Sequence, residues 1–305
     1  MHAWEAIQKA VDYIEENLQE EIGTEMLADM VSLSPFYFQR LFKRLTNKPV
    51  QEYIKLRRLS RAIETLNTNE ERILDVALDY GFSSHANFTR AFKETYGITP
   101  EEYKKTRPML NTVIKPEISM NYVLIDEGVP LIIGDIVLEI QRENLVAAES
   151  YIGFATDVNI VAQTPVGEST GIDVPGQLWT RFHTEKSVLS EYVNPAIELG
   201  MSYMANPEKG TFKYFAGVLL RTEISNTKDF VVQELPAGDY IVCKIEAESF
   251  EKLVKEALDK AGKYLFGTWL PKHQLATEPF SAEKYYTNCD YGNCMEIWVK
   301  LLDNK

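Results

Sequence analysis

Apolar residues recur at every third or fourth position through the first hundred residues, a period that predicts amphipathic helices. Thr24 has the residue type of a helix N-cap, and Ser34 followed by Pro35 is typical of an N-cap and a first helical residue. One apolar face persists from Val50 to Asn67, which predicts a single helix about 25 Å long. The expected helices cover residues 4–18, 22–31, a segment that starts after 34, 50–67 and a segment that starts at 73.

The stretch from Tyr80 to Lys104 predicts a turn followed by a helix with two different faces. Gly81 suits a tight turn because it tolerates positive φ, and Ser83 or Ser84 can cap the next helix. The inward face is apolar and carries Phe88, Ala91 and Phe92. The outward face is polar or basic and carries His85, Thr89, Arg90 and Lys93. This pattern is typical of a helix-turn-helix whose second helix enters the DNA major groove.

A second copy of this pattern lies fifty residues earlier and makes the interpretation more specific. Adding 50 maps Phe38 onto Phe88, and Arg40 onto Arg90. The inward apolar set of this copy is Phe38, Leu41, Phe42 and Leu45. The outward or edge set is Phe36, Gln39, Arg40, Lys43 and Arg44. Two such helices joined by the 50–67 helix could enter successive major grooves, which recur every ~34 Å, so one chain could bind DNA with two heads.

The pattern changes after a proline-containing segment, 106–118, which is expected to be a linker. Strands are expected at 132–140, 144–152, 201–205, 213–222, 230–234, 239–247, 279–287 and 294–302. Residues 168–176 have the composition of a loop, and helices are expected at 177–187 and 250–266. The order predicts two β-β-α-β-β repeats in an α+β domain. The expected fold is therefore multidomain, with an all-α N-terminal domain that holds two helix-turn-helix motifs joined by a long helix.

Charge is distributed unevenly between the two parts of the chain. The total is −13, but residues 1–110 hold 15 basic and 17 acidic residues, a net −2, whereas the remainder holds 17 basic and 28 acidic residues, a net −11. Residues 34–61 hold eight basic residues against the single acid Glu52, a local +7. Screening confines such fields to about 8–10 Å, so this segment can attract phosphates although the whole chain is acidic.

The motif A-x3-G-F-S-S-x3-F-x-R-x-F-K-x2-Y-G-I-T-P-x2-Y, from Ala77 to Tyr103, resembles the signature of AraC/XylS-family transcription regulators. The first copy is looser, with Val31-Ser32 where glycine is common. The resemblance implies an AraC-type DNA-binding domain at 1–107, with helix-turn-helix motifs at about 24–46 and 73–96. It implies base or backbone contacts from Phe36, Gln39, Arg40, Lys43, Arg44, Ser84, His85, Thr89, Arg90 and Lys93. Ala86, at a base-facing position, offers no hydrogen bond and can contact only a thymine methyl group or nothing.

The second half resembles the GyrI-like effector-binding domain and gives the chain a Rob-like domain order. The residues that carry the resemblance are GQLWTRF (176–182), FKYFAGVLL (212–220), LPAGDYIV (235–242), GTWLP (267–271), AEKYYT (282–287) and MEIWVKL (295–301). The resemblance implies a linker at 108–118 and an effector domain at 119–305. Its acidic strand residue matches Glu283, which would bind a cationic amphipathic compound. Aromatic side chains would line that pocket: Trp179, Tyr214, Tyr240, Trp269 and Tyr285.

Other classes of function find little support in the sequence. No Ser-His-Asp order, phosphate-binding glycine loop or His/Cys metal cluster is present, so we expect no enzyme, no metal and no cofactor. The three cysteines argue against a disulfide framework, and no window is apolar enough to span a membrane, which favours a cytoplasmic protein. The expected partners are promoter DNA, RNA polymerase and a small effector. A second half that only docks a protein, and a residual hydrolase built on Glu283 and Tyr285, remain as alternatives.

Overall fold

The computed structural model describes residues 2–68, 71–134, 136–163, 167–222, 229–287 and 293–302. The chain divides into two compact units. The helical unit comprises Met1–Tyr122 together with Gly167–Ile172, and the sheet unit comprises Val123–Val166 and Asp173–Lys305. No helix within the described ranges is long and apolar enough to cross a bilayer.

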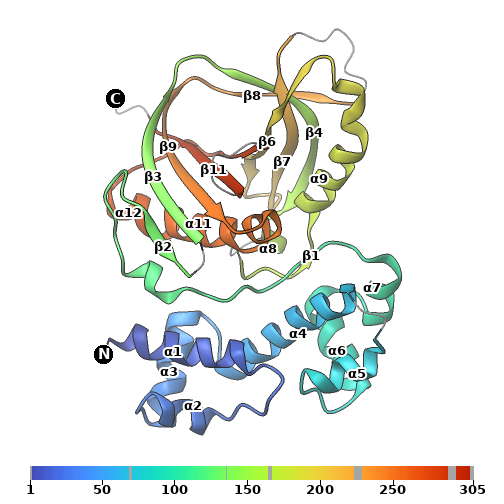
Figure 1. Cartoon of the computed structure of the whole chain (residues 1–305), viewed down its shortest axis with the longest axis vertical. Helices are drawn as coiled ribbons and strands as arrows, with labels where there is room; N and C mark the ends of the chain where they lie inside the picture. The colour runs from blue at the N-terminus through green and yellow to red at the C-terminus, as the bar shows by residue number, and fades with distance from the viewer. Residues whose placement is uncertain are drawn as a thin grey trace. The chain divides into compact units, whose positions relative to one another are not determined.

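Seven helices in the described part of the helical unit follow the apolar period of the sequence (Figure 1). They are α1 (Ala3–Glu16), α2 (Thr24–Met30), α3 (Pro35–Thr46), α4 (Val50–Thr68), α5 (Ile73–Asp79), α6 (His85–Tyr96) and α7 (Pro100–Thr106). Two separate clusters of buried side chains share α4. The first contains Phe38 and Phe42 together with α1, and the second contains Phe88 and Phe92 together with α7. The long helix therefore supplies a wall to each of two small cores.

Capping residues explain where the helices begin. The Ser34 hydroxyl accepts the Tyr37 N–H at 3.4 Å, and the Ser84 hydroxyl accepts the Asn87 N–H at 3.2 Å. The expected cap at Thr24 was wrong by one residue, because Gly23 is the N-cap of α2 and Thr24 is its first helical residue. Each of these helices starts after a residue with extended backbone, and Ser34 and Ser84 also accept an N–H of the first turn with their side chains.

Each of the two inter-helix turns contains one residue with positive φ, which is a glycine in one turn and a serine in the other. Gly81 has φ of +72°, and a Cβ there would lie 2.7 Å from a guanidinium nitrogen of Arg58. In the first turn Ser32 adopts φ of +57°, so a non-glycine residue takes the left-handed conformation. The missing glycine noted in the sequence thus leaves the turn in place, at the modest strain cost of a non-glycine left-handed residue.

The segment expected to be a free linker is packed on the helical unit, which corrects that expectation. The Val113 carbonyl accepts hydrogen bonds from the buried Arg57 guanidinium and from the Ser60 hydroxyl. Lys115 lies 2.6 Å from Asp12, and a short helical turn at Ile118–Asn121 follows. The helical unit accordingly extends to Tyr122, a few residues beyond the expected boundary at 118. Polar partners on α1 and α4 satisfy this backbone, so the segment has little freedom to act as a spacer.

In its described ranges, the sheet unit is built on one strongly curled antiparallel sheet of nine strands (Figure 1). Its strands are β2 (Leu131–Ile133), β3 (Ile136–Leu145), β4 (Glu149–Asn159), β6 (Val193–Asn206), β7 (Thr211–Leu220), β8 (Val231–Leu235), β9 (Gly238–Ala247), β10 (Ser281–Tyr286) and β11 (Asn293–Lys300). They are hydrogen-bonded in the order β2-β3-β9-β11-β10-β6-β7-β4-β8. The pairs β6-β7 and β10-β11 thus lie side by side and are joined through the β10–β6 pair.

Two helical segments accompany this sheet. The first is α9 (Val174–Glu185), preceded by the short α8 (Ile160–Gln163) and followed by a 3-10 turn at Lys186–Leu189. The second runs through α10 (Phe250–Lys252), α11 (Leu258–Tyr264) and α12 (Leu270–Lys272), interrupted by π-helical turns at Leu253–Ala257 and Leu265–Trp269. Such π turns shift the register of the face that a helix presents.

Several strand boundaries differ from those expected. The run at 132–140 is a hairpin and not one strand, because Gly134 adopts φ of +60° and lets β2 turn back onto β3. The expected loop at 168–176 contains the short strand β5 (Gly171–Ile172) and the start of α9. β5 pairs with β1 (Leu110–Asn111) inside the helical unit. Apolar alternation predicted where the strands lie, but it did not predict the turn at Gly134 that divides one of the expected strands.

Candidate DNA-binding and effector sites

The outward face of α3 carries five exposed side chains. Phe36 is 69% exposed, and Gln39, Arg40, Lys43 and Arg44 are also exposed. Phe38 and Phe42 on the opposite face are completely buried, so packing fixes the rotation of the helix about its axis. An aromatic side chain, an amide and three cations thus stand together on one surface of one rigid helix, as direct readout of base edges requires.

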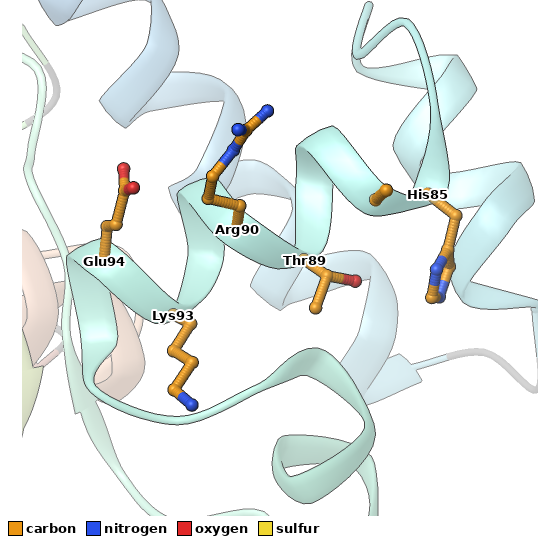
Figure 2. Close-up of a pocket in the computed structure, with 6 residues that line it drawn as sticks. His85, Thr89, Arg90, Lys93 and Glu94 are labelled. Atoms are coloured by element: carbon orange, nitrogen blue, oxygen red, sulfur yellow. The ribbon is translucent and has the colours of Figure 1, made fainter.

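The outward face of α6 forms a shallow hollow lined by His85, Ala86, Thr89, Arg90, Lys93 and Glu94. Figure 2 shows these side chains projecting from successive turns of the helix. Arg90 and Lys93 are exposed, but Thr89 is half-buried and its Oγ1 is enclosed without a hydrogen-bond partner. The buried Thr89 hydroxyl therefore offers a base less than the exposed amide of Gln39 on α3.

An acidic neighbour was missed for the second of these helices. His85 Nε2 lies 2.9 Å from Glu101 Oε1 of α7, and Glu94 shares the same hollow. His85 is thereby held at the start of α6 by a side chain from the next helix. The sequence I-T-P-E-E could have indicated this acidic neighbour, because it places two acids in the first turn of α7.

The local charge of +7 at 34–61 overstates the field that DNA would meet. Arg57 is buried against Glu15, with nitrogen–oxygen distances of 2.7 and 2.8 Å. Arg58 donates to the Leu18 and Glu20 carbonyls, and Arg61 pairs with Glu64 at 2.9 Å. Lys48 is also paired, with Glu168 at 2.7 Å. The exposed cations that remain are Arg40, Lys43, Arg44 and Lys55, so the basic surface centres on α3.

Glu283 lies at the middle of β10, on the face of the sheet that carries α9. Its Oε2 accepts hydrogen bonds from the hydroxyls of Tyr214 and Tyr285, each at 2.9 Å. Tyr214 in turn accepts the indole N–H of Trp179 at 3.0 Å. Three of the predicted aromatic residues are thus brought together with the predicted acid. Each hydrogen bond in the chain orients the next donor toward the carboxylate.

The electrostatics of this group favour the arrival of a positive charge. Burial raises the pKa of the Glu283 carboxyl, the two tyrosine hydroxyls partly offset the rise, and the nearby Asp173 carboxyl adds to it. Burial and the charge of Glu283 raise the pKa values of Tyr214 and Tyr285 well above 10, so both hydroxyls stay protonated donors. This half-buried carboxylate has no counter-charge among its described hydrogen-bond partners, and a bound cation would provide one.

Aromatic rings surround the same group. The Trp179 and Tyr285 rings pack edge to face with centroids 5.4 Å apart, and the Phe250 ring lies 6.4 Å from that of Tyr285. Phe250 is 54% exposed and was not expected at this site. Ring faces attract organic cations by about 0.5–2 kcal/mol each, depending on desolvation.

Both parts of the chain are similar to known protein families. A helix-turn-helix domain model matches residues 27–106, and the model of a GyrI-like small molecule binding domain matches residues 156–302. The regulatory protein SoxS of Salmonella typhimurium is 34% identical over 98 residues, which are 32% of this chain and 92% of SoxS. The chain belongs to the AraC family of transcription regulators.

Other relatives of this AraC-family chain match the same helical region. The HTH-type transcriptional regulator YbfP of Bacillus subtilis is 39% identical over 104 residues, and the match spans 34% of this chain and 35% of YbfP. A crystal structure of a regulator with an AraC-type DNA-binding domain, from Chromobacterium violaceum, is 30% identical with a TM-score of 0.33, and the match covers 34% of this chain and 92% of that one.

Two predicted pocket residues of the AraC-family chain lie elsewhere, which corrects the expected aromatic set. Tyr240 packs on the opposite face of the sheet against Trp298, and its hydroxyl donates to the Pro236 carbonyl. Trp269 is fully buried, stacks on His273 and donates its indole N–H to the Ile125 carbonyl at 3.0 Å. Aromatic density in the sequence did not distinguish these structural side chains from those beside Glu283.

Three further residues at the site were not found from the sequence. Asp173 caps α9 by accepting the Gly176 N–H at 2.9 Å. Burial raises the pKa of Asp259 to about 7, Lys263 opposes the rise, and Glu283 and Asp173 add to it. Gly200 faces Glu283, because a Cβ there would lie 2.8 Å from Glu283 Oε2 and would also collide with the Tyr214 hydroxyl. Only Asp173 had a local signal, since an acid two residues before proline is a helix-start pattern.

The described cysteines, Cys243 and Cys294, differ in state, and no candidate metal centre accompanies them in the same ranges. Within them, no group of three or more His, Cys, Asp or Glu side chains could hold a metal ion. Cys243 is a buried free thiol whose pKa is raised by burial to about 12, so it is an unreactive core residue. Cys294 is disulfide-bonded, which the sparse cysteine count had not predicted, and Cys289 lies outside the described residues.

Proposed function

We propose that this AraC-family regulator reads promoter DNA with two recognition helices, α3 and α6, each the second helix of a helix-turn-helix motif. The observation that supports this most is the repeated arrangement of two buried phenylalanines beneath an exposed arginine and lysine. Arg40 and Arg90 would contact base edges, Gln39, His85 and Thr89 would add to readout, and Lys43, Arg44 and Lys93 would contact phosphates. Phe36 and Ser84 would complete the interface, and RNA polymerase is the expected partner at the promoter.

Footprinting and salt titration test this proposal. Arg40→Ala and Arg90→Ala should each reduce the binding free energy for the preferred site by about 1–3 kcal/mol, because a bidentate arginine contributes about that much. Lys93→Ala should weaken binding to all sequences and lower the slope of log K against log salt concentration by about one unit. Unchanged footprints for both arginine variants would contradict the proposal.

We infer that the sheet unit, with its two β-β-α-β-β repeats, binds an organic cation beside Glu283 and thereby modulates the regulator. The observation that carries the inference is a half-buried carboxylate whose hydrogen-bond partners are two tyrosine hydroxyls, next to the rings of Trp179 and Tyr285. The same contacts favour a binding site over a catalytic one, because the tyrosine hydroxyls are held as donors to the acid.

A thermal-shift panel of aromatic cations tests the effector site. Tetraphenylphosphonium and larger amphipathic cations should raise the melting temperature of the wild-type protein, whereas neutral analogues should not. Glu283→Gln keeps an acceptor for both tyrosines but removes the charge, so its shift should disappear. Equal shifts for wild type and Glu283→Gln, or none with any cation, would favour a sheet unit that only docks a protein.

A further inference from the structure

Residues 167–172, here named the strap, belong by sequence to the second half of the chain but pack within the helical unit. Their strand β5 pairs with β1, with Leu110 opposite Ile172 and Asn111 opposite Gly171. The Asn111 side chain also donates to the Ile172 carbonyl at 3.3 Å. A piece of the effector half is thus built into the DNA-binding half as an added strand.

The strap is bound through contacts near both helix-turn-helix motifs. Glu168 pairs with Lys48 at 2.7 Å, and both side chains are only 15% exposed. Lys48 lies in the turn between α3 and α4, at the end of the first recognition helix. The Gly167 carbonyl accepts the Ile114 N–H at 3.2 Å. On the other side, Leu110 packs against the buried cluster that supports α6.

The far end of the strap leads directly into the effector site. Ile172 is followed by Asp173, the N-cap of α9, and Pro175 stiffens the first turn of this helix. From α9, the Trp179 indole reaches Tyr214, and Tyr214 reaches Glu283. The negative charge of Asp173 also contributes to the raised pKa of Glu283, after the effect of burial. One peptide bond therefore separates the N-cap of α9, the helix that carries Trp179, from a residue paired with β1.

We propose that the strap couples occupancy of the Glu283 site to DNA binding by transmitting a shift of the α9 N-terminus to β1 and to the Lys48 turn. The proposal rests on the proposed effector function and adds the route by which it acts. A cation beside Glu283 attracts Asp173 as well, which changes the position of the α9 cap and the strand pairing of the next residue. Leu110 of β1 packs against the cluster that contains Phe88 and Phe92 of α6, and Lys48 follows α3 directly. Each recognition helix is therefore supported by an element that the strap touches.

The test compares DNA affinity with and without saturating tetraphenylphosphonium, using the full chain. For the wild type the ratio of the two dissociation constants should differ from one by about fivefold or more, the usual range of allosteric coupling. Glu168→Gln should bring the ratio to within about twofold of one, while its cation-induced thermal shift stays as in wild type. The exchanged pair Lys48→Glu with Glu168→Lys should restore the ratio.

A matched control and a second measurement keep the outcomes distinct. Glu64→Gln removes the same charge from an exposed pair with Arg61 in the same unit and should leave the ratio at the wild-type value. In the wild type, cation binding should also change the hydrogen-exchange rate of the Ile114 amide, which donates to the strap.

Each result decides between the two proposals. A wild-type ratio in Glu168→Gln, or a ratio of one in a wild type that binds the cation, would overturn the strap proposal and leave the effector site standing. An unchanged exchange rate at Ile114 would count equally against it. The absence of any thermal shift with cations would instead contradict the effector site itself.

Discussion

Glu283 and Lys284 are adjacent residues of β10 that face opposite sides of the sheet, and they differ in the kind of group that lies next to each charge. The Lys284 side chain is 4% exposed, pairs with Glu149 at 2.8 Å and lies 3.8 Å from the centre of the Trp298 ring. Among the residues that the structure describes, the groups that act on the Glu283 carboxyl are two tyrosine hydroxyls and an aspartate, with no cation among them. The protein supplies a carboxylate and an aromatic face for its own lysine, but it supplies only hydrogen-bond donors for the glutamate. The glutamate is therefore the member of the pair that can accept an external cation.

Lys284→Met should have the largest effect on this comparison. It leaves Glu149 without its partner, and removal of one member of a buried ion pair costs about 3 kcal/mol, here at the lower end because Glu149 is 28% exposed. Urea unfolding should show the loss. The double variant Lys284→Met with Glu149→Gln should recover most of it, since no charge is then left unpaired. A single variant as stable as the wild type would show that the two buried charges do not differ as described.

Glu283→Gln should have a smaller and opposite effect on stability in the absence of a ligand. A carboxyl whose pKa is raised on folding binds protons more tightly in the folded state, so it lowers stability as pH rises from about 4.5 through the raised value. The variant lacks this loss. Thermal unfolding between pH 4 and pH 8 should therefore show wild type and variant nearly equal at acidic pH, with the variant relatively more stable toward pH 8. A relative gain for the wild type with rising pH would mean that Glu283 is already paired with a cation.

Tyr285→Phe, compared with Tyr286→Phe, should give the smallest effect. The Tyr285 hydroxyl donates to Glu283, whereas that of its neighbour Tyr286 donates to Glu296 on the other face. Loss of the first donor should weaken cation binding about threefold to tenfold, the value of one hydrogen bond, because the ionised form of Glu283 loses support. Isothermal titration with an aromatic cation should show no such loss for Tyr286→Phe. Equal losses in the two variants would indicate a general packing effect.

The same contrast between faces explains why the predicted site was found only in part. Period-two alternation placed Glu283 and Tyr285 on one face, and both lie together in the structure. Tyr240 and Trp269 were predicted from aromatic composition alone, and they pack in other cores. Asp259 and Gly200 reach the site from elements far apart in the sequence, and no local spacing relates them to Glu283.

Local chemistry by itself determined most of the helical unit. Each helix there needs only its own apolar period and a cap, so Ser34, Ser84 and the paired phenylalanines were sufficient to predict the helices α3 and α6. Tertiary structure decided which charges stay available. Arg57 and Lys48 appear in the sequence as part of a basic segment, and only the fold joins them to Glu15 and Glu168, 42 and 120 residues away. A charged side chain is neutralised by neighbours in three dimensions, which can be far away in the sequence. Only the folded sheet therefore shows that Lys284 pairs with Glu149, whereas the described groups that act on Glu283 include no cation.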